Sequence, residues 1–220
     1  MSIIKKFRTF RHSFFRDHGK NNHVFVIDES GNRHEVRRLK YSYIKFRGDN
    51  NTIEIYEPTT QLELTATVYN NTKIIISQSH YKRIISISGF TNNGNTITFG
   101  RDLSTSGPLQ ISLMRGNGDI TIGDDCMFAC GIIIQLGDGH DIYSNATNKI
   151  INSNTDIVVG NHVWIANDAV LLKGTKIGNN CIVGLKSIVT KSFDQDNTII
   201  AGIPARAVKS DINWTRKSQY

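Results

Sequence analysis

Residues 159–189 of the chain read VGNHVWIANDAVLLKGTKIGNNCIVGLKSIV. Aliphatic residues recur in this stretch at strict six-residue spacing, namely Val159, Ile165, Leu171, Ile177, Val183 and Val189. Four positions after each of the first five stands a small or β-branched residue, namely Val163, Ala169, Thr175, Cys181 and Ser187. A six-residue period fits neither an amphipathic helix nor a simple alternating strand. It predicts a chain that turns a corner every six residues.

Three such sides close one triangular coil, and each coil advances the chain by about 4.8 Å, the spacing of parallel strands. The aliphatic side chains are then expected to point inward and the small ones to lie near the corners. Asn161, Gly178 and Asn180 suit corners, because Asn and Gly tolerate left-handed backbone conformations. The spacing predicts that equivalent residues of successive coils stack in pairs: Val159 with Ile177, Ile165 with Val183, and Leu171 with Val189.

The pattern continues upstream in a looser form. Ile122, Phe128 and Ile134 are again six residues apart, and residues 44–122 contain short Ile- and Thr-rich segments between Asn and Gly turns. We therefore expect one β-helical domain over residues 21–205. Its coils are irregular to about residue 120 and regular over 122–189.

The two ends differ in composition from this domain. Residues 1–20 are basic, and within them residues 3–17 predict a short amphipathic helix with Phe and Ile on its apolar side. Such a helix would cap the open end of the coils or contact another subunit; the alternative is a peripheral contact with a membrane surface. Residues 206–220 predict a tail folded on the other end.

Composition limits the class of protein. The net charge is +7, and 39% of the residues are hydrophobic, as in ordinary globular proteins. The N-terminal stretch has no apolar run of signal-peptide or membrane-span length, and the three cysteines form no CxxC motif, so we expect a cytoplasmic protein. No nucleic-acid-binding motif accompanies the positive charge, which suits a phosphate-rich cofactor or an anionic saccharide instead.

One long interruption breaks the repeat. Ile134 and Val159 are 25 residues apart, which is not a multiple of six, so residues 135–156 must leave the coil as a loop. This loop contains His140, with Asp138 and Asp141 close by in sequence. Imidazole suits general-base catalysis near neutral pH, and a carboxylate can fix its tautomer. Taken alone, a loop histidine is equally consistent with a solvated residue.

Four motifs together carry a family resemblance: GDGHDIYS at 137–144, VGNHVWI at 159–165, VTK at 189–191 and AGIPAR at 201–206. Over residues 115–215 the chain resembles the hexapeptide-repeat acyltransferase superfamily. It is most similar to bacterial polysaccharide O-acetyltransferases of the polysialic acid type and, more distantly, to galactoside and maltose acetyltransferases. The resemblance implies an all-β fold, a single-stranded left-handed parallel β-helix with a protruding catalytic loop and short terminal appendages.

The resemblance also implies roles for individual residues. His140 would deprotonate the acceptor hydroxyl, Trp164 would line the acetyl and acceptor pocket, and Asp138 or Asp141 would orient the histidine. The positions that match the acetyl-CoA site are Ala166, Asn167, Gly184, Leu185, Thr190, Lys191, Arg206 and Lys209. No metal is implied. The chain departs from the family pattern at Ala166, where glycine is usual, and at Asp141, where close relatives often have proline.

The function so implied is direct transfer of acetyl from acetyl-CoA to a hydroxyl of a bacterial cell-surface saccharide. The family's homotrimers place each of three sites between two subunits. One alternative is an N-acetyltransferase acting on an amino-sugar nucleotide or an antibiotic. A zinc carbonic anhydrase on the same scaffold needs three histidines, whereas only His140 and His162 lie in the repeat region. A non-catalytic structural β-helix would have regular outward threonine ladders and no histidine loop.

Overall fold

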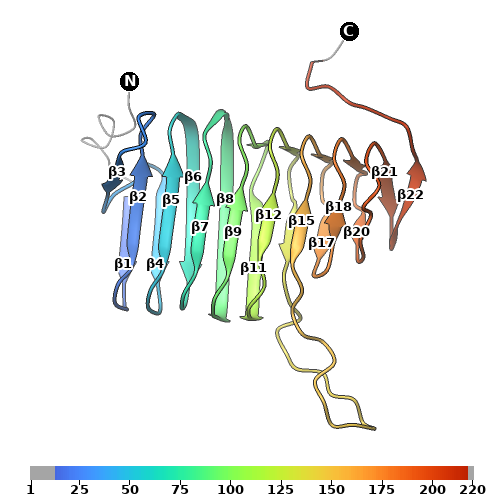
Figure 1. The fold of residues 1–220 in the computed structure, drawn as a ribbon, viewed down its shortest axis with the longest axis horizontal. Helices are drawn as coiled ribbons and strands as arrows, with labels where there is room; N and C mark the ends of the chain where they lie inside the picture. Colours follow the sequence, from blue (N-terminus) through green and yellow to red (C-terminus); the bar gives the residue numbers. More distant parts are fainter. Residues whose placement is uncertain (1–12, 218–220) are drawn as a thin grey trace.

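The protein is a parallel β-helix. The computed structural model describes residues 13–217, in which 22 strands form three sheets that run along one axis from the N-terminal to the C-terminal end (Figure 1). Within this range every regular element is a strand, so no helix there is long and apolar enough to cross a membrane. The predicted all-β, parallel β-helical architecture is confirmed.

Each sheet takes one strand from each successive coil that reaches it. Sheet 1 contains, in spatial order, β1 (Ser13–Asp17), β4 (Ser42–Phe46), β6 (Thr59–Val68), β8 (Ser79–Asn92), β11 (Leu109–Gly116), β14 (Ile133–Gln135), β17 (Val170–Leu172) and β20 (Ile188–Val189). Sheet 2 contains β10 (Ser104–Thr105), β13 (Met127–Phe128), β16 (Trp164–Ile165), β19 (Ile182–Val183), β21 (Ile199–Gly202) and β22 (Ala205–Lys209). Sheet 3 contains β18 (Lys176–Ile177), β15 (Ile157–Val159), β12 (Ile120–Ile122), β9 (Thr96–Phe99), β7 (Lys73–Ile76), β5 (Thr52–Tyr56), β2 (His23–Ile27) and β3 (Arg33–Glu35).

The regular coils have the register that the repeat predicts. Val159 pairs with Ile177, Ile165 with Val183 and Leu171 with Val189, each across a parallel ladder. All six repeated aliphatic side chains are buried, with at most 3% of their surface exposed, and the small residues four positions later are buried as well. Each Å² of apolar surface that is buried stabilises the folded state by about 25 cal/mol, and this burial holds the coils together.

The N-terminal coils are larger, as the less regular sequence predicts. In sheet 3, Ile53 pairs with Ile74, Ile74 with Ile97 and Ile97 with Ile120, so successive coils are 21 to 23 residues long. The extra residues lie in the long strands β6 and β8, which cover the side that sheet 2 occupies in later coils. These coils continue the same apolar core without a break.

The N-terminal segment departs from the prediction. Residues Ser13–Asp17 form strand β1, parallel to β4, so the predicted helix is wrong for these residues; residues 1–12 lie outside the described part of the chain. The edge of β4 offers backbone groups that a strand can pair and a helix cannot. Phe14 also stacks on Tyr43 with ring centroids 5.0 Å apart, and Phe15 packs against the core.

The C-terminal segment also differs from a simple end cap. The expected boundary at residue 206 falls inside β22, which pairs antiparallel with β21, for example Ala201 with Arg206. Beyond it, residues 210–217 return along the side of the coils toward the N-terminal end (Figure 1). We call residues 210–217 the C-terminal strap. Residues 218–220 lie outside the described part of the chain.

Candidate active site

The predicted loop leaves the helix at the corner between sheets 1 and 3. It follows β14 and precedes β15, and it projects clear of the coils (Figure 1). The loop folds back on itself, because Tyr143 forms an antiparallel bridge with Ile150 and the Ile151 N–H donates to the Ile142 carbonyl at 2.9 Å. The interruption of the repeat is thus an ordered arm on a rigid scaffold, as functional loops often are.

An ion pair holds the base of this arm. Lys173 Nζ on the next coil lies 2.6 Å from Asp138 Oδ2 and donates to the Asn152 carbonyl at 2.8 Å. Asn152 Nδ2 donates to Asp138 Oδ2 and to the His140 carbonyl, both at 2.8 Å. The hydrogen bonds from Lys173 and Asn152 lower the pKa of Asp138 below its ordinary value. Sequence reasoning missed Lys173 and Asn152, because no spacing rule connects Lys173 in the next coil to a residue inside the arm.

His140 stands at the exposed mouth of a small pocket. The pocket has a volume of about 220 Å³ and is lined by Asn117, Asp138, Gly139, His140, Asp141, Ile150, Asn152, Ser153 and Asn154. Within residues 13–217 the carboxylate of Asp138 binds Lys173 and Asn152, and no hydrogen bond joins the His140 ring to a carboxylate. The imidazole is therefore open to a ligand. Which carboxylate orients it stays a prediction, because Asp138 and Asp141 are both exposed.

Trp164 lies on a different side of the molecule. It is in β16 of sheet 2, half-buried, and it pairs with Met127 and Ile182 in the neighbouring coils. The residues that line the His140 pocket do not include it. Within one chain, the fold thus places His140 at the corner between sheets 1 and 3 and Trp164 on sheet 2.

The predicted acetyl-CoA positions fall at two corners. Ala166 and Asn167 follow β16, and Gly184 and Leu185 follow β19 one coil later, so these four stack at the corner between sheets 2 and 1. Arg206 and Lys209 are exposed on β22 of the same sheet 2. Thr190 and Lys191 follow β20 at the corner between sheets 1 and 3, from which the His140 arm also projects. The first four lie together at one corner, and Arg206 is near them because it pairs with Ala201, whereas Lys209 pairs with Ile199 at the other end of the same strand pair. Thr190 and Lys191 follow a strand two coils beyond β14, the strand that the arm leaves.

The buried cysteines are poor nucleophiles. Burial raises the pKa of the Cys126 thiol to about 12, and burial also raises the pKa of Cys181. A thiolate is the reactive form of cysteine, so neither side chain would be activated near neutral pH. Both fill positions on the inner side of the coil instead.

Known proteins resemble this chain in sequence and in fold. The family model "Bacterial transferase hexapeptide (six repeats)" matches residues 156–191. A polysialic acid O-acetyltransferase from Neisseria meningitidis is 34% identical over 193 residues, which cover 79% of this chain and 90% of the relative.

Two solved structures share the fold over most of the chain. The polySia-specific acetyltransferase NeuO has a TM-score of 0.72 and 25% identity, with 94% of this chain and 90% of that chain covered. The polysialic acid O-acetyltransferase OatWY has a TM-score of 0.64 and 25% identity, with 94% and 93% covered. Repeat, histidine arm and relatives agree, and the chain belongs to the hexapeptide-repeat family of bacterial acyltransferases, in the group of the meningococcal polysialic acid O-acetyltransferase.

Proposed function

We propose that this protein transfers an acetyl group from acetyl-CoA to a hydroxyl of a bacterial cell-surface saccharide of the sialic acid, capsule or O-antigen type, with His140 as general base. The observation that carries the proposal is the ordered arm at residues 136–156, which presents an unobstructed imidazole on a scaffold shared with polysialic acid O-acetyltransferases. The family resemblance further supports a left-handed sense for the coils.

The chemistry requires a base. A sugar hydroxyl is a weak nucleophile near neutral pH because it holds its proton tightly. A neutral imidazole at His140 would accept that proton while the hydroxyl oxygen bonds to the acetyl carbonyl carbon. The same imidazole would return the proton to the departing CoA thiolate. Backbone N–H groups of a neighbouring coil would stabilise the charge on the carbonyl oxygen. Such direct transfer needs neither a metal nor a nucleophilic cysteine.

The surface beside Gly184 fits acetyl-CoA as a co-substrate. A Cβ added at Gly184 would lie 2.9 Å from the Ala201 Cβ, so the coils close tightly only because the side chain is absent. Near it Leu185 and Ile203 are 64% and 70% exposed, and Arg206 is an exposed cation that pairs with Ala201. Val208 and Lys209, also exposed, follow on the same strand toward Ile199. An apolar strip next to two cations suits a ligand with an apolar arm and several phosphates. Because acetyl-CoA is a cytoplasmic metabolite, we place the reaction in the cytoplasm.

The separation of His140 from Trp164 supports a shared site. A site that uses both residues must take the arm from one subunit and the tryptophan from another, which a homotrimer with three such interfaces provides. The exposed aliphatic side chains near Gly184 would face the same interface.

Subunit mixing tests this arrangement. His140→Ala and Trp164→Ala subunits, each with its own tag, are expected to be inactive alone but active in oligomers that contain both. In a cyclic trimer that contains both variants, about a third of the sites combine an intact arm with an intact tryptophan. Activity is measured after two-tag purification, and mass in solution is measured alongside. Mixed oligomers as inactive as their parents, or a single-chain mass, would contradict the shared site.

The function itself is tested by CoA-thiol release from acetyl-CoA over a panel of acceptors. The panel contains sialic acid monomer, oligomers and polymer, neutral capsule sugars, and an amino-sugar nucleotide. We expect a sialic acid or other cell-surface saccharide to stimulate release and to gain an acetyl ester that alkali removes. An alkali-stable amide on the amino sugar would favour the N-acetyltransferase alternative, and no stimulation by any member of the panel would refute the proposal.

A further inference from the structure

The C-terminal strap follows one corner of the β-helix from coil to coil. The corner between sheets 3 and 2 is formed in five successive coils by residues with positive φ, between 53° and 56°, namely Asp102, Asp125, His162, Asn180 and Asn197. Backbone hydrogen bonds join these corners in a column. Every second residue of the strap contacts this column. Ile212 and Asn197 exchange hydrogen bonds, Trp214 stacks on His162, and Arg216 binds Asp125.

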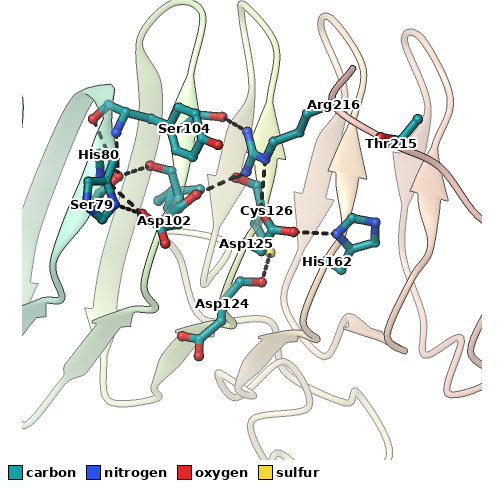
Figure 2. Close-up of polar contacts among 12 residues, drawn as sticks. Ser79, His80, Asp102, Ser104, Asp124, Asp125, Cys126, His162, Thr215 and Arg216 are labelled. Carbon is teal, nitrogen blue, oxygen red and sulfur yellow. Dashed lines mark hydrogen bonds and ion pairs between the residues drawn. The ribbon is translucent and has the colours of Figure 1, made fainter. Parts of the chain in front are cut away.

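Arg216 anchors the far end of the strap. Its guanidinium donates to Asp125 Oδ1 at 2.8 Å and to Ser104 Oγ at 2.6 Å. It also donates to the backbone carbonyls of Asp102 at 3.0 Å and Cys126 at 2.8 Å. Figure 2 shows the guanidinium inserted between Ser104 and Asp125, with Asp125 bonded in turn to His162. A planar cation with four directed partners has one favoured position, so the strap is fixed where it crosses these coils.

Asp125 links this anchor to His162. Partial burial raises the pKa of Asp125, but the hydrogen bonds from Arg216 and His162 outweigh it, and the net effect is a lowered pKa. The His162 ring lies between two acceptors, with Nδ1 2.6 Å from Asp125 Oδ2 and Nε2 3.0 Å from the Trp214 carbonyl. The carboxylate and the strap backbone therefore hold His162 from both sides.

Trp214 is the side chain that this framework positions. Its ring stacks on His162 with centroids 4.1 Å apart and planes 10° from parallel, and its Nε1–H donates to the His162 carbonyl at 2.8 Å. Only 9% of the residue is exposed, yet it does not belong to the continuous apolar core inside the coils. Trp214 is therefore buried against residues on the outer surface of the β-helix and does not pack in its interior.

The aromatic neighbour of Trp214 on that surface is Trp164. The two ring centroids are 6.2 Å apart at 48°, within the range of favourable tilted aromatic pairs. Trp164 is otherwise flanked along its ladder by Met127 and Ile182, and it remains half-buried. Trp214 therefore restricts the rotation of the Trp164 ring from the side that the ladder leaves open.

We propose that Trp214, held by Arg216 and His162, is a positioning residue that sets the orientation of Trp164 for the acceptor. This inference rests on the proposed function, whose shared site uses Trp164 together with His140. The strap would act through Trp164, where the acetyl group and the acceptor meet, and not on the CoA-binding positions near Gly184 and Arg206, which make none of the strap's contacts described above.

Kinetics provides the first test, on the full-length protein. Trp214→Ala and Arg216→Ala are expected to raise the KM for the saccharide and lower kcat, with kcat/KM for the saccharide falling on the order of tenfold to a hundredfold. The KM for acetyl-CoA should stay as in the wild type, because the CoA-binding positions lie away from the strap. Trp214→Phe keeps an aromatic ring on His162 and should recover most of the activity. Thr215→Ala is the matched control, because Thr215 lies apart from these contacts in Figure 2.

Fluorescence provides a second test that does not need activity. The chain has two tryptophans, so Trp214→Phe leaves Trp164 as the sole tryptophan fluorophore. On that background, Arg216→Ala should shift Trp164 emission to longer wavelength and increase its quenching by acrylamide, whereas Thr215→Ala should not. If no saccharide is acetylated by the wild type, the proposed function fails while this measurement still decides the strap's effect on Trp164.

Two results would overturn the inference. One is a Trp214→Ala protein with unchanged saccharide kinetics and an Arg216→Ala change that leaves Trp164 emission unaltered. The other is an equal loss for saccharide and acetyl-CoA together with a lower melting temperature, and no recovery in Trp214→Phe. That second pattern would assign the strap a purely structural role.

Discussion

His140→Ala is expected to lower kcat for saccharide acetylation on the order of 10²–10⁴-fold, the usual contribution of a general base. The KM for acetyl-CoA should change by no more than about twofold, because losing the base removes an interaction made only in the transition state. The ring can be removed without disturbing the arm, since Asn152 binds the His140 backbone carbonyl and the arm is anchored through Asp138 and Lys173. Initial rates of thiol release at varied acetyl-CoA and saccharide measure both parameters.

The pH profile gives this prediction its control. Wild type and His140→Ala are compared across a pH series, because a general base contributes only while it can accept the hydroxyl proton. The depressed pKa of Asp138 means that its anchoring ion pair is fully present above the ordinary carboxyl pKa and is lost only as pH drops through the lowered folded-state value. Loss of the arm's anchor therefore does not account for a difference between the two proteins measured near neutral pH. His34→Ala, an exposed histidine paired with Asp28 on the N-terminal coils, should behave as wild type. Full turnover by His140→Ala would remove the general base from the mechanism.

The sequence predicted the fold best in the regular coils, where the local repeat alone determines the position of each residue. Val159, Ile165 and Leu171 stack on their counterparts as predicted because one strict spacing fixes both the inward direction and the register. The position of the histidine arm followed from the same spacing, since any interruption that is not a multiple of six must leave the coil.

Contacts between distant parts of the chain could not be predicted in this way. Arg216 is 91 residues from Asp125, and no periodic pattern connects them. The basic and aromatic residues of the strap look like those of any solvated tail. The helix predicted around Phe14 and Phe15 was wrong for a related reason. A short run with apolar residues on two faces is compatible with either a helix or a strand, and here pairing with the edge of β4 decides between them. That His140 and Trp164 lie on different sides of the molecule could likewise be seen only in the three-dimensional structure.

Gly123→Ala should destabilise the protein by about 3 kcal/mol, the upper range for overpacking a close contact. A Cβ at this position would lie 2.5 Å from Asn161 Oδ1 and 2.6 Å from the Gly160 carbonyl oxygen of the next coil. The backbone there cannot move aside, because the Gly123 N–H donates to the Val159 carbonyl and β12 pairs with strands on both sides. Gly100 and Gly160 face the following coil in the same way, so glycine at this corner is a requirement of coil stacking.

Thermal unfolding distinguishes this steric cause from backbone strain. The φ angle of Gly123 is not in the left-handed range, so alanine is conformationally acceptable there and only the contact with the next coil is at fault. Gly31 offers the opposite case, with φ of +83° and open space around an added Cβ. Gly31→Ala should therefore cost about 1 kcal/mol, against a fall of about 10 °C in the melting midpoint for Gly123→Ala. Equal melting midpoints for the two variants would show that adjacent coils can separate at this corner. Gly100, Gly123 and Gly160 would then not set the spacing between coils.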